Sequence, residues 1–358
     1  MSISVDAQAA APALDTIWYT RCPVPTASGV AIDTGQLSEE FAADGIGVAS
    51  LRASTDASVR ESHFDHNQAA LFREGGNVPA LWARSRGQAT RLIGLTWVEE
   101  FQSLIVRPDS GIREPRHLAG KRILLPTHGA ARVDFARAMA LRGLDSTLRL
   151  AGLTLDDVEL VDVATPVSDL VERRGTRYEH EAFRPELDAL RRGDGDAFYG
   201  KGSPAIDTIR TQGLVAVSDL AQADDPRLRV NNGTPRTITV SEELLSSRPD
   251  LVTRYLAVLL RAASWAAEHP AETHAILASE TGAPVEAAAA AYGDDAHRRL
   301  RPRFDIEAID LLTDQKNFLL LHGFLDGDVD VQSWLDPAPF GAALELAHDT
   351  VTETGDNS

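Results

Sequence analysis

Short apolar runs and amphipathic segments alternate along most of this chain of 358 residues. Runs rich in β-branched and aromatic residues, bounded by turn-forming residues, predict strands. They span residues 16–20, 46–52, 91–95, 103–107, 122–125, 158–163, 197–199, 214–217 and 236–240. Segments with a helical period lie between several of these runs, and we predict helices at 130–141, 181–192 and 205–212. A glycine follows each of them, at Gly143, Gly193 and Gly213, and marks the expected helix end.

After residue 240 the pattern becomes entirely helical and stays so to residue 325. Ser241, followed by two glutamates, is typical of a helix N-terminus and predicts a helical region over 244–267. Within it, Pro249 predicts a break and Pro270 predicts the end, because proline lacks the amide proton that a helix interior uses.

Alternating strands and helices predict an α/β protein with largely parallel sheets. The chain exceeds the roughly 250–300 residues at which single cores stop growing, so we expect two lobes. The switch to helices is explained if residues 1–105 and 231–358 form lobe 1 and residues 106–230 form lobe 2. This is a two-lobed, periplasmic-binding-protein-like (type II) fold, whose ligands lie in the cleft between the lobes.

Composition places the chain among ordinary globular proteins, with 43% hydrophobic and 25% charged residues. The net charge of −18 argues against nucleic acid or an anionic membrane surface as a partner. It also means that an anionic substrate would be repelled by the protein as a whole. A site for such a substrate must therefore supply positive charge locally.

The single cysteine excludes an internal disulfide and is consistent with a reducing compartment. The first residues carry neither a basic stretch nor a long apolar stretch, so they do not resemble a secretory signal. No run reaches the 18 or so apolar residues that a membrane-spanning helix requires. We therefore expect a cytoplasmic protein. We also expect a monomer.

Cys22 ends a strand-like run and opens the turn Pro23-Val24-Pro25. Each proline fixes its own φ, and Pro23 also pushes Cys22 towards an extended conformation. A thiol held in this way is a candidate catalytic group. The alternative is that Cys22 is a small buried hydrophobic residue, which is the commoner role of a free cysteine.

Arg73 is a candidate anion ligand because it precedes two adjacent glycines, Gly75 and Gly76. A guanidinium donates two parallel hydrogen bonds to an oxyanion, and a glycine pair can turn its backbone amides towards the same oxygens as a nest. The alternative is a surface arginine before an ordinary turn. His63 and His66 resemble a metal-binding fragment, but two ligands without a third are a weak signal.

These segments together resemble the aryl-sulfinate desulfinases. The matching motifs are Tyr19-x-x-Cys22-Pro23-Val24-Pro25, His63-Phe64, Arg73-x-Gly75-Gly76, Arg301-Pro302-Arg303-Phe304-Asp305, and Gln315-x-x-Phe318-Leu319-Leu320 with Trp334 after it. Their order and spacing are more specific than any one of them. The resemblance implies the same two-lobed fold.

The resemblance also implies a hydrolase that cleaves the carbon–sulfur bond of an aromatic sulfinate and releases sulfite, without metal or organic cofactor. Cys22 would then donate a proton to the ring or attack the sulfur, and His63 would manage the proton of the thiol. Arg73 and Gly76 would bind the sulfinate oxygens, with Gly75 and Gln68 beside them. The residues leave both routes open.

Two helix N-termini are further candidates for binding oxyanions. One is the Thr127-His128-Gly129 segment before the helix predicted at 130, and the other is Ser203, which precedes the helix predicted at 205. Lys201 marks a departure from the family, because Gly200-Lys201-Gly202 stands where biphenyl-specific members carry a Trp-Leu-Pro-Trp segment. We therefore expect smaller or more polar aryl sulfinates as substrates.

Two other functions fit the same fold. One is a non-catalytic solute receptor for a sulfonate-like or aromatic anion, which would not require Cys22. The other is a different carbon–heteroatom lyase on the same scaffold. Measuring sulfite release separates both from a desulfinase.

Overall fold

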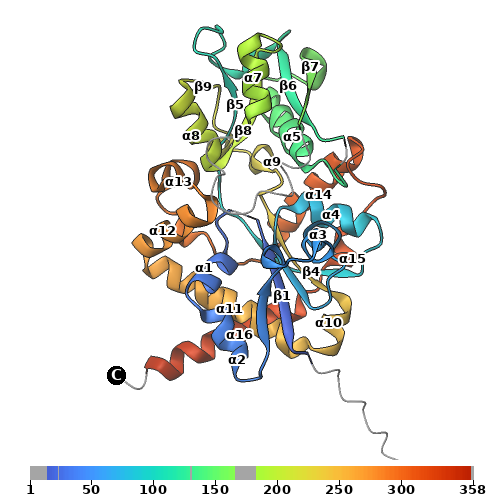
Figure 1. Cartoon of the computed structure of the whole chain (residues 1–358), viewed down its shortest axis with the longest axis vertical. Helices are drawn as coiled ribbons and strands as arrows, with labels where there is room; N and C mark the ends of the chain where they lie inside the picture. Colours follow the sequence, from blue (N-terminus) through green and yellow to red (C-terminus); the bar gives the residue numbers. More distant parts are fainter. Residues whose placement is uncertain (1–13, 23, 130, 166–182, 356–358) are drawn as a thin grey trace, which may run out of the picture.

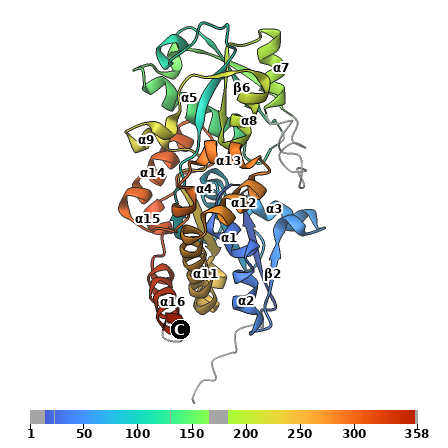
Figure 2. The ribbon, with the colours of Figure 1, turned by 90° about the vertical axis from the view of Figure 1, so that its left-hand side faces the viewer.

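The computed structural model describes residues 14–22, 24–129, 131–165 and 183–355. Two five-stranded sheets lie one above the other along the long axis of the molecule (Figures 1 and 2). In the first sheet the strand order is β2-β1-β3-β10-β4, and in the second it is β7-β6-β8-β5-β9. The α/β architecture expected from the sequence is therefore confirmed.

The strands of the first sheet are β1 (Thr16–Arg21), β2 (Gly47–Ser50), β3 (Leu71–Gly75), β4 (Thr90–Thr96) and β10 (Arg236–Ser241). Those of the second are β5 (Gln102–Val106), β6 (Arg122–Thr127), β7 (Glu159–Ala164), β8 (Ala197–Lys201) and β9 (Val215–Ala216). One strand in each sheet, β10 or β5, runs antiparallel to both neighbours, and the other pairings are parallel. The sequence pattern missed only β3 among these strands.

Helices cover both faces of the two sheets. Those that precede β10 in the sequence are α1 (Ala27–Asp33), α2 (Gln36–Ala42), α3 (Ala57–Asp65), α4 (Asn77–Ser85), α5 (Phe135–Arg149), α7 (Arg184–Arg192), α8 (Gly202–Gln212) and α9 (Pro226–Arg229). Those after it are α10 (Glu242–Ser247), α11 (Pro249–Glu268), α12 (Pro270–Thr281), α13 (Val285–Tyr292), α14 (Ile306–Leu321), α15 (Val331–Trp334) and α16 (Ala338–Gly355).

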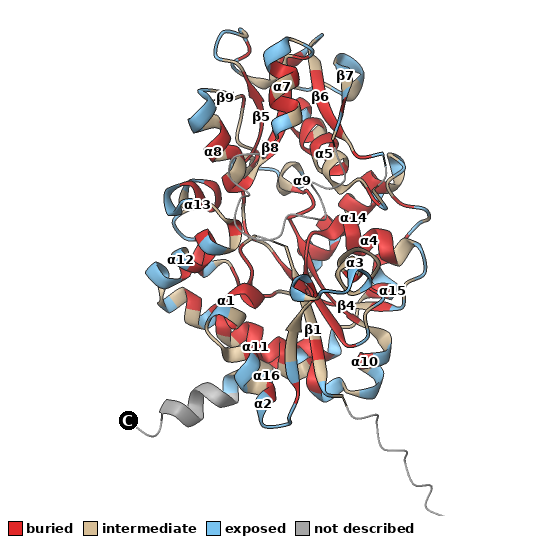
Figure 3. Cartoon of the chain, viewed as in Figure 1, coloured by how far each residue is buried: buried red, intermediate tan, exposed pale blue. Residues whose placement is uncertain are grey.

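The core follows the two-residue period of the strands. Leu124 of β6 belongs to the apolar cluster that includes α1, α11 and α7, whereas its neighbours Ile123 and Leu125 belong to the cluster that includes α4, α5 and α14. Successive side chains of a strand point to opposite faces, so one strand contributes to both layers. Buried residues accordingly run through both sheets and the facing sides of their helices (Figure 3).

The chain passes between the sheets twice, once between β4 and β5 and once between β9 and β10. The lobe boundary predicted after residue 105 falls inside β5, a strand of the second sheet. Glu100 lies on the first crossing, and Asn232 and Gly233 lie on the second. Both crossings therefore bring residues to the junction between the sheets.

The helices predicted after residue 240 are confirmed, including the cap at Ser241, the break at Pro249 and the stop before Pro270. Gly193 and Gly213 end α7 and α8 in left-handed conformations, as predicted. The stop predicted at Gly143 is wrong. A side chain at Gly143 would overlap the ring of Tyr199, so this glycine serves close packing inside α5.

Three sequence predictions fall on residues outside the described ranges: the proline at 23, the helix start at 130 and the helix start at 181. Within the described ranges, no helix is both long enough and apolar enough to cross a lipid bilayer.

Candidate active site

The ends of β1 and β3 bring Cys22 against the two glycines. The strands are parallel, with Arg21 paired to Glu74, so the residues that follow them emerge at the same sheet edge. The Cys22 amide donates to the Glu74 carbonyl at 3.3 Å, and the Gly76 amide donates to Cys22 Sγ at 3.3 Å. Gly76 is also the N-cap of α4, so the positive end of that helix favours negative charge on the sulfur.

Gly75 and Gly76 are required for close approach. A Cβ at Gly75 would lie 2.7 Å from Cys22 Sγ, and one at Gly76 would overlap the side-chain amide of Asn232. The amide nest expected from the sequence is not formed, because Gly75 lies in β3 and Gly76 has φ −51° and ψ 141°. Neither glycine adopts the left-handed conformation that a nest requires.

Arg73 is fully buried in β3, so the interpretation of a surface arginine before a turn is wrong. Its Nε donates to the His63 carbonyl at 3.1 Å, whereas Nη1 and Nη2 have no partner within the described residues. Burial lowers the pKa of Arg73, and Cys22 acts in the opposite direction. Nη1 would lie 3.5 Å from a Cβ at Gly75, which places the free donors behind the thiol.

His63 lies on α3, where its Nδ1 is 2.8 Å from the hydroxyl of Thr20. Its ring meets Phe64 edge to face. Burial and the neighbouring Arg73 lower its pKa well below the ordinary value, so the ring is neutral at neutral pH. The hydrogen bond described for this imidazole thus goes to Thr20 rather than to the thiol. Gln68 lies in the loop between α3 and β3.

A cavity of about 260 Å³ lies between the sheets, and Cys22 is one of its lining residues. Its lining is mostly apolar and comes from both sides of the junction. The first-sheet side and the crossings supply Cys22, Val24, Gly76, Glu100, Asn232, Gly233, Arg236 and Tyr292. The second-sheet side supplies Pro126, His128, Phe135, Ala136, Met139, Ala140, Thr165, Phe183, Pro185, Glu186, Tyr199, Lys201, Gly202 and Pro204. His63 and Arg73 lie behind this wall and do not line it.

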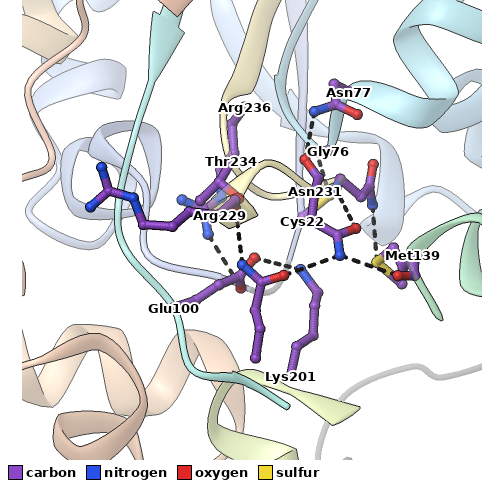
Figure 4. Close-up of polar contacts among 12 residues, drawn as sticks. Cys22, Gly76, Asn77, Glu100, Met139, Lys201, Arg229, Asn231, Thr234 and Arg236 are labelled. Carbon is purple, nitrogen blue, oxygen red and sulfur yellow. Dashed lines mark hydrogen bonds and ion pairs between the residues drawn. The ribbon is translucent and has the colours of Figure 1, made fainter. Parts of the chain in front are cut away.

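Lys201 lines the cavity, and its Nζ donates to Glu100 Oε1 at 2.6 Å (Figure 4). Arg236 of β10 is also part of the wall and fully buried, with Nη2 3.8 Å from Glu100 Oε2. Ser203 is buried in the first turn of α8, between two lining residues. The cavity wall thus carries two cations, Lys201 and Arg236, that share the carboxylate of Glu100, and a second carboxylate, Glu186, lines it as well.

The oxyanion site expected at Thr127 and Gly129 is not formed. The helix begins only at Phe135, and Asp134 caps it by accepting from the Arg137 amide at 3.0 Å. The other oxygen of Asp134 accepts from the His128 amide at 2.7 Å. Thr127 and Gly129 do not line the cavity, whereas His128 between them does.

Three polar residues in the cavity wall were not predicted from the sequence, namely Glu100, Asn232 and Arg236. They lie on or beside the crossings, where no periodic pattern marks a side chain as facing a cleft. The Asn231-Asn232-Gly233 turn was the one available signal, because such runs mark tight connections. Groups of three or more His, Cys, Asp or Glu side chains that could hold a metal are absent from the described residues.

Comparison with known proteins decides the family. The chain is 31% identical over 352 residues to 2'-hydroxybiphenyl-2-sulfinate desulfinase of Rhodococcus erythropolis, covering 90% of this chain and 92% of the relative. The same enzyme from Rhodococcus qingshengii matches equally well. The chain belongs to the 2'-hydroxybiphenyl-2-sulfinate desulfinase family. No protein-family model matches it.

Solved structures support this desulfinase family and its fold. The crystal structure of DszB carrying a cysteine-to-serine substitution, in complex with biphenyl-2-sulfinic acid, superposes with a TM-score of 0.74 at 28% identity. The match covers 92% of this chain and 99% of DszB. The periplasmic sulfonate-binding protein SsuA from Methylobacillus flagellatus KT gives a TM-score of 0.68 at 17% identity, covering 93% of this chain and 94% of SsuA. This second likeness confirms the periplasmic-binding-protein-like fold alone.

Proposed function

We propose that this protein is a cofactor-independent desulfinase that cleaves the carbon–sulfur bond of an aromatic sulfinate. The observation that carries the proposal is the position of Cys22. Its sulfur accepts a hydrogen bond from the Gly76 amide, and the residue lines a mostly apolar cavity. Membership of a desulfinase family supports the reaction type. Cavities that bind drug-sized ligands measure roughly 300–1,000 Å³, so a volume of about 260 Å³ favours a small aromatic ligand.

Two routes use the same residues. In the first, the thiol of Cys22 gives its proton to the ring carbon as the carbon–sulfur bond breaks. Sulfur dioxide leaves, and the negative charge of the sulfinate passes to the Cys22 thiolate. Hydration of sulfur dioxide gives hydrogensulfite and a proton that restores the thiol. This chemical step is that of a lyase.

In the second route the sulfur of Cys22 bonds to the sulfinate sulfur while the ring carbon takes the thiol proton. The arene leaves, and water then opens the sulfur–sulfur bond to give hydrogensulfite and the free thiol. This route is hydrolytic on the enzyme. Both routes have the same overall equation, sulfinate plus water giving arene plus hydrogensulfite.

The surroundings of Cys22 suit either route. The Gly76 amide and the positive end of α4 stabilise negative charge on the sulfur. Arg73 is buried behind the cavity wall, and its two Nη atoms have no hydrogen-bond partner within the described residues. It supplies positive charge close to Cys22, and a sulfinate oxygen would reach its donors only where the Cys22 side chain moves aside from Gly75. The neutral ring of His63 is hydrogen-bonded to the hydroxyl of Thr20, and the backbone carbonyl of His63 accepts from Arg73 Nε and holds the guanidinium in place.

The test is sulfite release by the purified protein without added metal or cofactor. Benzenesulfinate and biphenyl-2-sulfinate are the substrates, and Cys22→Ser is the control. We expect sulfite and the corresponding arene in equal amounts. Tight binding of both sulfinates without any sulfite release would instead identify a solute-binding protein.

A further inference from the structure

A cluster of charged side chains lines the cavity away from Cys22. It consists of Glu100, Lys201 and Arg236, and Figure 4 shows the Glu100–Lys201 pair near Arg236, with Cys22 and Gly76 across from them. Lys201 Nζ donates a hydrogen bond to Glu100 Oε1 at 2.6 Å. Arg236 is fully buried, yet none of its three guanidinium nitrogens donates a hydrogen bond within the described part of the chain. Buried donors of this kind are costly unless a ligand or solvent satisfies them.

The cluster has an excess of positive charge. Glu100 is one carboxylate shared between two cations, since its other oxygen lies 3.8 Å from Arg236 Nη2. Glu186, a second carboxylate in the cavity wall, comes from α7 and has interactions of its own. Burial and the negative charge of Glu100 raise the pKa of Tyr292, another lining residue, and Arg236 acts in the opposite direction, so both charges reach the cavity.

The second crossing connects the cluster to the thiol. A Cβ at Gly233 would overlap Glu100 and lie 3.0 Å from Lys201 Nζ, while the preceding residue, Asn232, touches Gly76. Adjacent Cα atoms are about 3.8 Å apart. The two polar ends of the cavity are thus separated by little more than one residue step plus the side chains at each end.

The N-terminus of α8 reinforces the cluster. This helix has 11 residues, and its N-cap, Lys201, makes no side-chain capping bond. Its positive end adds to the field of Arg236, which is the unpartnered buried group that points to a ligand.

We infer that Glu100, Lys201 and Arg236 form a second anion subsite, and that the substrate is an aryl sulfinate bearing a carboxylate on the ring away from the sulfinate. This inference rests on the proposed desulfinase function. Arg236 would receive the carboxylate through two parallel hydrogen bonds, and Lys201 would contribute charge from the opposite lobe. A biaryl sulfinate without a carboxylate would leave the Arg236 donors without a hydrogen-bond partner and would place apolar surface against the Glu100–Lys201 pair.

The first experiment compares kcat/KM for 3-carboxybenzenesulfinate and 4-carboxybenzenesulfinate with that for benzenesulfinate. We expect the native enzyme to prefer at least one carboxylated compound by about tenfold or more, the effect of a hydrogen-bonded charge. Arg236→Met should reduce this preference by about tenfold or more, and Arg236→Lys should restore part of it. Arg229→Met is the matched control, because Arg229 pairs with Glu99 outside the cavity wall and should leave the preference unchanged.

Preference of the native enzyme for benzenesulfinate, or an equal loss for all substrates in Arg236→Met, would overturn the subsite. If Arg236→Met does not fold, Lys201→Met replaces it with the same expected loss of preference. A second experiment does not depend on turnover: calorimetry with benzene-1,3-dicarboxylate, benzene-1,4-dicarboxylate and benzoate. We expect a dicarboxylate to bind about tenfold or more tightly than benzoate, and this difference to require Arg236. If no sulfinate is turned over, the proposed function fails, and this binding difference still decides the subsite.

Discussion

Gly75→Ala tests whether Cys22 Sγ lies directly against the backbone of Gly75 in β3. The new Cβ would lie 2.7 Å from Cys22 Sγ and 3.4 Å from the Cys22 amide nitrogen. A sulfur atom cannot remain at that distance, so the Cys22 side chain must rotate. It would then lose the hydrogen bond that it accepts from the Gly76 amide at 3.3 Å. A displacement of about 1 Å at a reacting group can cost about 100-fold in rate. Overpacking a core typically costs about 1–3 kcal/mol, and we expect the lower end because a single side chain can move.

The assays are sulfite release, urea unfolding and the rate of thiol alkylation, all on Gly75→Ala. We expect turnover to fall about 100-fold, the free energy of unfolding to fall by about 1 kcal/mol, and the alkylation rate to change as the sulfur leaves its amide. Gly341→Ala in α16 is the control, because a Cβ there meets nothing within 4 Å. Turnover near that of the native enzyme in Gly75→Ala would refute the placement of Cys22 Sγ.

Three further predictions follow from the same region. Cys22→Ser should keep the fold and lose sulfite release, because a hydroxyl is a weaker acid and nucleophile than a thiol; turnover near the native rate would exclude both routes. Arg73→Lys should weaken sulfinate binding measured by calorimetry on a Cys22→Ser background, because an ammonium cannot reproduce the guanidinium fork; unchanged affinity in Arg73→Ala would exclude this arginine. Burial lowers the pKa of His66 from 6.5 to about 3, so stability is lost as pH falls through this interval, by about 2 kcal/mol at pH 5. His66→Asn should remove that loss between pH 7 and pH 5 in urea unfolding; the control is His117→Asn, at a partly exposed position beside Glu114, which leaves the buried imidazole of His66 in place.

The sequence predicted strands and helices well where one face of an element is buried and the other is not. The helices after residue 240 show this, because their caps and prolines are local signals that the fold does not override. Strand β3 was missed because all five of its residues are buried, including Arg73 and Glu74, so no alternation of polar and apolar positions marks it. Two charged residues in a row are usually evidence for a loop.

Glycine misled the sequence interpretation at two places where packing, rather than turn geometry, selects it. Gly143 lies inside α5, where the ring of Tyr199 occupies the space that a side chain would need. Gly75 lies in β3, where Cys22 Sγ occupies that space. A glycine in a sequence does not reveal which of these reasons applies, since both depend on a residue that is distant in the chain. Such positions are expected where backbone and side chain meet closely at a site.

The cavity wall shows why local motifs identified the thiol end of the site and missed the other end. Cys22 and Gly76 emerge from paired parallel strands, and each stands in a short motif that can be recognised alone. Glu100, Gly233 and Arg236 come together only because the chain crosses twice between the sheets, and those crossings are defined by topology. The reaction type can therefore be inferred from local sequence, whereas substrate preference depends on how the two lobes meet. A relative that keeps the thiol motif but changes the crossings should keep the chemistry and change its substrate.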